Sequence, residues 1–138
     1  MPIESEVKIK IDNLDAIKAK ILEIHAEPYK KKVLEIDEYF DNKNRLRNSG
    51  EILRLRNNSI LTYKGPAQKK QKIKIAEEIE VMVDNGAYTK DIFMRLGYLP
   101  TLKKEKYREA YILHLTKICV DEPPMGNYLE IEGSKEGV

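Results

Sequence analysis

Acidic residues recur as Glu-x-Glu pairs in three segments that are otherwise rich in apolar and β-branched residues. The pairs are Glu4/Glu6, Glu78/Glu80 and Glu130/Glu132. Because successive side chains of a β-strand point to opposite faces, two residues that are two positions apart share a face. Carboxylate oxygens are hard ligands of the kind that Mg²⁺ and Mn²⁺ prefer. The three pairs therefore predict acidic strand faces that could hold a divalent metal ion.

Basic residues alternate in the same way in other segments. The alternating sets are Arg54 and Arg56 around Leu55, then Lys104, Lys106 and Arg108, with Lys8, Lys10 and Lys64 added. An Arg guanidinium can bind two phosphate oxygens at once, and a Lys ammonium acts as a point charge. A concave sheet face that carries both carboxylates and cations is typical of a site for a metal-chelated polyanion.

A solvated outer face is the alternative for each of these pairs. Antiparallel sheets often carry Glu–Lys pairs on the side that faces water, and this is the favoured interpretation for any single pair. Because the alternation of charged residues recurs in five segments, a shared charged cavity is favoured instead. His25 and His114 lack a zinc spacing, Cys119 is expected to be a small wall residue, and no glycine-rich phosphate loop occurs.

The elements that must position these residues follow from the periodicity. Residues 3–11 alternate as a strand, and Leu14, Ile17, Ile21 and Ile24 then follow at helical spacing after a cap at Asp12 or Asn13. A second helix is expected at 87–96 and a polar loop at 65–72. Further strands are expected at 34–40, 52–56, 60–64, from 75, and at 102–110, 111–115, 117–121 and 128–132. Asn57, Asn58 and Ser59 predict a tight hairpin turn.

The two halves of the chain resemble each other, since each begins with a Glu-x-Glu strand, passes through a helix and continues into hairpins. A short unit of this kind cannot bury its apolar face alone. We therefore expect residues 1–138 to form a single α+β domain, mainly β. The expected architecture is a closed or nearly closed antiparallel barrel, with a few external helices covering the apolar strand faces.

Composition narrows the classes of partner. Lys and Arg number 25 and Asp and Glu 23, so a net charge of +2 gives no reason to expect binding to nucleic acid. No segment approaches the roughly 20 apolar residues of a membrane helix, and residues 1–11 do not resemble a signal peptide. Cys119 is the single cysteine, which predicts a cytoplasmic protein without an internal disulfide. The oligomeric state stays open, a homodimer included.

Several segments also resemble a known family in their order along the chain. Glu4-Ser5-Glu6-Val7-Lys8 resembles the E-x-E-x-K signature of the CYTH superfamily, also called triphosphate tunnel metalloenzymes. The blocks that follow it are residues 37–41 (DEYFD), 53–56 (LRLR), 62–66 (TYKGP), 78–80 (EIE), 106–108 (KYR) and 128–133 (YLEIEG). The resemblance covers nearly the whole chain.

This resemblance implies an eight-stranded tunnel that binds a small-molecule triphosphate with Mg²⁺ or Mn²⁺. The implied metal-binding residues are Glu4, Glu6, Glu78, Glu80, Asp121, Glu130 and Glu132. The implied substrate-binding residues are Lys8, Arg54, Arg56, Lys64, Lys106 and Arg108, and the implied catalytic residues are Glu4, Glu6 and Lys8. Family members usually continue into a further helix and tail, which the resemblance implies are missing after Val138.

Three functions are compatible with these residues. The first is metal-dependent hydrolysis of tripolyphosphate or of an organic triphosphate, in which a Glu-x-Glu carboxylate orients the attacking water. The second is a class IV adenylyl cyclase, which converts ATP to cyclic AMP and pyrophosphate and needs nearly the same wall residues. The third is a phosphate-binding module without catalysis.

Overall fold

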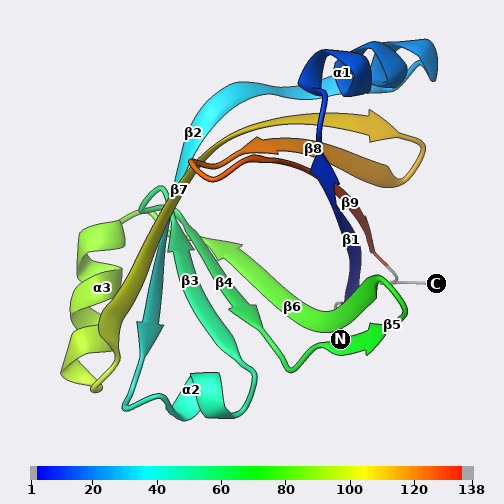
Figure 1. Cartoon of the computed structure of the whole chain (residues 1–138). Coiled ribbons are helices and arrows are strands. Elements are labelled where there is room, and N and C mark those ends of the chain that lie inside the picture. The colour runs from blue at the N-terminus through cyan, green and yellow to red at the C-terminus, as the bar shows by residue number, and fades with distance from the viewer. Residues whose placement is uncertain (1–2, 135–138) are drawn as a thin grey trace.

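The computed structural model describes residues 3–134, which form an antiparallel β-barrel with helices outside it (Figure 1). The strands are β1 (Ile3–Ile11), β2 (Glu27–Asp41), β3 (Ile52–Arg56), β4 (Ile60–Lys64), β5 (Gln68–Lys70), β6 (Ile73–Met82), β7 (Leu99–Leu113), β8 (Thr116–Glu122) and β9 (Asn127–Ser134). Eight of them form a ring in the order β1-β9-β8-β7-β2-β3-β4-β6, which the pairing of β1 with β6 closes. The prediction of an eight-stranded antiparallel barrel is confirmed, and β5 is an additional strand that pairs with β6.

The helix α1 (Leu14–Glu23) begins where the alternation of β1 ends. The side chain of Asn13 caps the helix by accepting a hydrogen bond from the Ala16 amide at 3.0 Å. The apolar stripe of the helix packs on the outer face of β8. The core at this point consists of Ile11, Ile21, Ala26, Ile118 and Val120. The predicted first helix and its cap are therefore confirmed.

The helix α3 (Gly86–Arg95) lies on the opposite side of the barrel from α1 (Figure 1). Asn85 caps it through a hydrogen bond from the Tyr88 amide. Phe93 of this helix packs edge-on against Phe40 of β2, with ring centroids 5.2 Å apart. The third helix, α2 (Arg45–Asn48), is a single turn that the sequence did not predict. Asp41 holds it by accepting hydrogen bonds from the Leu46 and Arg47 amides.

The pleat of the strands separates an apolar outer side from a charged inner side. Leu55 and Val120 are buried on the outer side, and Arg54 and Arg108 are buried on the inner side. The tight turn after β3 has positive φ angles at Asn57 and Asn58, as the predicted hairpin requires. The charges that line the barrel interior require partners of opposite charge. The candidate functional site therefore lies inside the barrel.

Some boundaries differ from the sequence-based expectation. The predicted loop at 65–72 contains β5, because its backbone pairs with β6 although its side chains are Gln and Lys. The strand expected at 34–40 begins at Glu27, and those expected at 102–110 and 111–115 are one strand, β7. These long strands pair with each other over most of their length, so partner hydrogen bonds outweigh local propensity.

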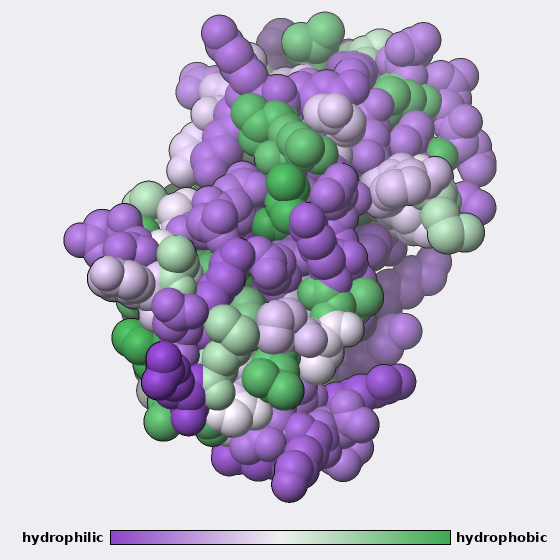
Figure 2. Space-filling view, turned by 90° about the vertical axis from the view of Figure 1, so that its left-hand side faces the viewer, coloured by the Kyte–Doolittle hydropathy of each residue, from purple (hydrophilic) through white to green (hydrophobic). Residues whose placement is uncertain are grey.

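The expectation that helices cover the apolar strand faces is wrong for parts of β1 and β6, the two strands whose pairing closes the ring. Ile9 is 46% exposed, Ile79 41% and Val81 52%. On the side that carries α3, apolar patches alternate with hydrophilic side chains (Figure 2). Among the described residues, no helix combines the length and the apolar character that a membrane-spanning segment requires.

Candidate functional site

The inner faces of the strands enclose a cavity of about 180 Å³. Its lining is almost entirely charged, because each strand presents its alternate polar residues inward. The lining residues are Glu4, Lys30, Glu35, Arg54, Arg56, Ile60, Lys64, Glu78, Glu80, Lys106, Arg108, Ala110, Lys117, Glu130 and Glu132. Carboxylates and cations from distant parts of the sequence thus meet in one enclosed space.

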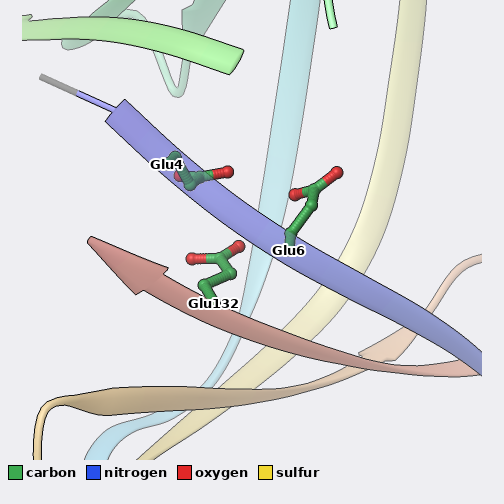
Figure 3. A group of neighbouring side chains, drawn as sticks. All are labelled: Glu4, Glu6 and Glu132. Atoms are coloured by element: carbon green, nitrogen blue, oxygen red, sulfur yellow. The ribbon is translucent and has the colours of Figure 1, made fainter. Parts of the chain in front are cut away.

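Three carboxylates converge at one end of this arrangement (Figure 3). Glu4 and Glu6 come from β1, and Glu132 comes from β9, directly opposite Glu6 in the strand register. Each offers one oxygen, and these oxygens all lie within 4.8 Å of one another. Oxygen Oε2 of Glu6 is buried and has no hydrogen-bond partner among the described residues. A cluster of hard oxygen donors with an unsatisfied atom fits a divalent cation such as Mg²⁺ or Mn²⁺.

Burial and the proximity of other carboxylates alter the pKa values of these groups. Burial and then the neighbouring Glu78 carboxylate raise the pKa of Glu4 to about 9, although the nearby Lys64 acts to lower it. The neighbouring Glu130 carboxylate, followed by burial, raises the pKa of Glu6 to about 7. Burial and the charge of Glu130 also raise the pKa of Glu132. A metal ion must therefore displace protons from this cluster when it binds.

This proton uptake predicts a pH dependence of stability. In metal-free protein we expect the melting temperature to fall as the pH rises from about 5 to about 8, because the folded chain holds protons that the unfolded chain has released near pH 4.5. Groups with a lowered pKa, such as Glu78, contribute to the stability of the fold, and this contribution is lost only when the pH falls below this range. Thermal unfolding in EDTA measures this slope, which Mg²⁺ or Glu6→Gln should flatten. A melting temperature that rises across the same range would contradict the prediction.

Two arginines of the cavity are held by carboxylates on neighbouring strands. Arg108 donates to Asp121 through Nε at 2.6 Å and Nη2 at 2.7 Å, and Nη2 also reaches Glu130 at 2.7 Å. Arg56 donates to both oxygens of Asp37, at 2.7 and 3.0 Å. Burial acts to lower the pKa of each arginine, but the hydrogen bond to the aspartate and the negative charges nearby together outweigh it, so the net shift is upward.

Other cations of the cavity are held loosely. The side chain of Arg54 donates to the Thr62 hydroxyl at 3.3 Å, and its buried Nε has no partner among the described residues. The ammonium of Lys64 lies 3.6 Å from Glu4 and 3.7 Å from Glu78. Lys106 is 3.2 Å from Asp121. These weakly paired cations are the ones that an incoming anion can engage at least cost.

The structure places most of the predicted site residues on the cavity wall. Glu78 and Glu80 lie on β6, where Glu80 accepts a hydrogen bond from Thr62. Three predicted residues lie outside the lining itself: Glu6 joins the carboxylate cluster, Asp121 stands behind Arg108, and Lys8 lies over the Tyr128 ring at 4.8 Å. Asp121 and Glu130 thus contact Arg108, and they do not belong to the group of three converging carboxylates.

Sequence reasoning missed several residues of the site. Glu35 and Asp37 alternate on β2, Lys117 shares a face of β8 with the predicted Asp121, and Lys30 lies near the start of β2. The same two-residue spacing that indicated the Glu-x-Glu pairs also marks Glu35 with Asp37. That signal alone does not show that Asp37 meets Arg56, because this contact depends on the register between β2 and β3.

Comparison with known proteins agrees with this geometry. The family model described as CYTH domain matches residues 2–137. "Putative adenylate cyclase MJ0240" of Methanocaldococcus jannaschii is 36% identical over 96% of this chain and 77% of its own length. The structure of the PH1819 protein from Pyrococcus horikoshii has a TM-score of 0.77 at 30% identity, over 94% of this chain and 77% of that one.

A plant protein has the same fold at lower identity. HpAC1 from Hippeastrum, whose structure is described with a dominant triphosphatase activity, has a TM-score of 0.72 at 17% identity over 96% of this chain and 80% of that one. With the family model matching nearly all residues, and with a charged interior in a ring of eight strands, this chain belongs to the CYTH domain family.

Proposed function

We propose that this protein binds a small-molecule triphosphate together with Mg²⁺ or Mn²⁺ inside the barrel and hydrolyses it. The observation that carries the proposal is that two kinds of charged group meet at one cavity. A cluster of carboxylates suited to a cation lies beside Arg54, Lys64 and Lys106, whose charges are only loosely paired. A metal-chelated polyphosphate satisfies both groups at once.

Each group has a distinct role in this proposal. Glu4, Glu6 and Glu132 would hold the metal ion, which as a Lewis acid offsets negative charge on the phosphate oxygens. The loosely paired cations would bind the phosphate oxygens directly. A carboxylate of a Glu-x-Glu pair would orient a water molecule and accept its proton. The water oxygen then bonds to the terminal phosphorus while the bond from that phosphorus to the bridging oxygen breaks, leaving phosphate and the shortened chain.

The other predicted residues complete the site. Arg56 and Arg108 would keep the wall in place through their aspartate partners and turn toward phosphate when it binds. Glu78 and Glu80 add carboxylates on β6 that can neutralise these cations or join a second metal ion. Lys8, two residues after Glu6 on β1, would contribute positive charge near the carboxylate cluster.

An adenylyl cyclase is the second candidate, and the name of the archaeal relative favours it. A cyclase would hold ATP with the same wall residues, but the ribose 3′-hydroxyl would attack the α-phosphorus and pyrophosphate would leave. HpAC1, which has the same fold, is described with a dominant triphosphatase activity, and this supports hydrolysis as the first candidate. A binding module without catalysis is the third candidate.

A substrate panel separates the three functions. We expect tripolyphosphate, ATP or thiamine triphosphate to release phosphate when Mg²⁺ or Mn²⁺ is present, and excess EDTA to abolish this release because Glu4 and Glu6 would then lack their ion. Phosphate and cyclic AMP are measured from the same ATP reaction. Undiminished turnover in EDTA contradicts the metal site, cyclic AMP as the main product shows the cyclase, and tight binding without any product shows the module.

A further inference from the structure

The helix α3 carries large apolar residues on the side that faces away from the barrel. Tyr88 is 69% exposed, Ile92 is 59% exposed, and Leu96, which directly follows the helix, is 68% exposed. Their four-residue spacing places them in one stripe about 12 Å long on a single helix face. Together with Asp91 and Arg95 they line a shallow groove of about 420 Å³. The outward face of a surface helix is normally polar, so this stripe calls for a partner.

The stripe is not needed to hold α3 on the barrel. Phe93 attaches the helix to β2 through its edge-on contact with Phe40, and Lys90 forms an ion pair with Glu38 at 2.6 Å. The groove is lined by α3 and Leu96 alone, so within residues 3–134 no other element covers it. The helix stands outside the ring of strands with this side open (Figure 1).

Two opposite charges lie along one side of the stripe. Asp91 and Arg95 are one helical turn apart, and among residues 3–134 neither has an ion-pair partner within 4.0 Å. A second α3 that runs antiparallel across a two-fold axis would place Asp91 of each copy opposite Arg95 of the other. Ile92 would then lie near the axis and meet its own copy. A face that complements itself in both apolar contact and charge is what a symmetric dimer requires.

The position of the described chain ends favours a second copy over another segment of the same chain. The strands β1 and β9 hold the first and last described residues. Both lie across the ring from β2, the strand on which α3 packs (Figure 1). A segment attached at either end would have to pass around the barrel to reach the groove, whereas a second copy approaches it from outside.

We propose that this stripe is the interface of a symmetric dimer, in which α3 packs antiparallel against α3 of a second copy. The contact would bury Tyr88, Ile92 and Leu96 and form two reciprocal ion pairs between Asp91 and Arg95. An interface of one short helix from each copy is small, so monomer and dimer exchange readily. The charged cavity is lined by no residue of α3, so this inference is independent of the proposed function.

Sedimentation equilibrium of the whole chain between about 1 µM and about 1 mM tests the dimer. We expect the average mass to rise with concentration toward twice the 16.0 kDa of one chain. Ile92→Arg should raise the dissociation constant about 30-fold or more, because the symmetry brings the two new charges together near the axis. Tyr88→Ala should raise it about tenfold without adding charge. Leu22→Arg, a matched change on α1 at a leucine that is 67% exposed, should leave it unchanged.

Charge exchange tests the antiparallel arrangement. Asp91→Arg and Arg95→Asp should each weaken the dimer about fivefold or more, because like charges would then face each other across the interface. The two changes combined in one chain should return the dissociation constant to within about threefold of the parent value, because opposite charges face each other again. Thermal unfolding at low concentration checks that each variant is folded.

Three results would overturn the inference. The first is a parent chain that stays monomeric over the whole concentration range. The second is a dimer whose dissociation constant neither Ile92→Arg nor Tyr88→Ala changes, since its interface must then lie elsewhere. The third is a double charge variant that associates no better than the two single ones. Phosphate release enters none of these measurements, so they leave the proposed function untouched.

Discussion

Replacement of Arg108 by alanine is expected to lower the free energy of unfolding by about 3–5 kcal/mol. The guanidinium is buried and donates to Asp121 and Glu130 at 2.6–2.7 Å. Alanine would remove the buried cation that compensates both carboxylates and leave Asp121 with only the partly exposed Lys106 beside it. A buried charge without adequate compensation costs far more than a broken surface pair. The effect should appear in the ligand-free protein, since it arises within the folded chain.

Chemical denaturation at neutral pH measures this change. Lys106→Ala is the matched control, because Lys106 also approaches Asp121, at 3.2 Å, but its side chain is 22% exposed. We expect that control to lose less than about 1 kcal/mol. Adding Asp121→Asn and Glu130→Gln to Arg108→Ala should restore part of the lost stability by removing the uncompensated charge. A loss for Arg108→Ala no larger than that of Lys106→Ala would contradict this account.

The inner and outer faces of the strands could be predicted from alternation alone. Leu55 requires an apolar environment, so the pleat places Arg54 and Arg56 on the other face, and the structure has this arrangement. The first helix could be predicted equally well, because the two-residue alternation of the strand ends before Asn13 and the helical spacing of apolar residues begins after it. In both cases the information lies within about ten residues of chain, where the two periodicities are unambiguous.

The pairing of charges could not be predicted, because it depends on the register between strands. Asp37 meets Arg56, and Arg108 meets Asp121, only because these residues stand directly opposite in β2–β3 and β7–β8. A shift of one residue in either register would turn these partners to opposite faces. The sequence therefore indicated which residues face the cavity without showing which cations are already paired. That distinction changes the expected roles of the two neighbouring arginines of β3.

Arg56 is now expected to combine a structural role with any role in binding. Its bidentate contact with Asp37 stabilises the fold in the absence of substrate. Arg54 has no carboxylate contact of this kind within residues 3–134, where its hydrogen bond is to the neutral Thr62 hydroxyl. Arg54 is thus the residue at which a loss of substrate binding can be separated from a loss of stability.

Arg54→Ala should reduce kcat/KM for hydrolysis of the triphosphate about 30- to 1,000-fold. This corresponds to a loss of about 2–4 kcal/mol of transition-state stabilisation. The reason is that its buried Nε has no partner in the described structure and is therefore free to bind a phosphate oxygen. The same cavity also holds the carboxylates that are suited to a metal ion. Arg54→Lys should recover only part of the loss, because an ammonium cannot make the forked contact. The free energy of unfolding should change by less than about 1 kcal/mol, since the bond to Thr62 is long and uncharged on one side.

Arg56→Ala provides the comparison, because its loss of the Asp37 pair should lower stability and kcat/KM together. Both quantities are measured on each purified variant, with Mg²⁺ or Mn²⁺ present in the kinetic assay. If Arg54→Ala keeps kcat/KM within a few-fold of the parent, Arg54 does not contact phosphate and the substrate must lie elsewhere in the cavity. If Arg54→Ala instead unfolds as readily as Arg56→Ala, its charge is part of the structural network, and the contrast between paired and loosely paired cations does not mark the substrate-binding residues.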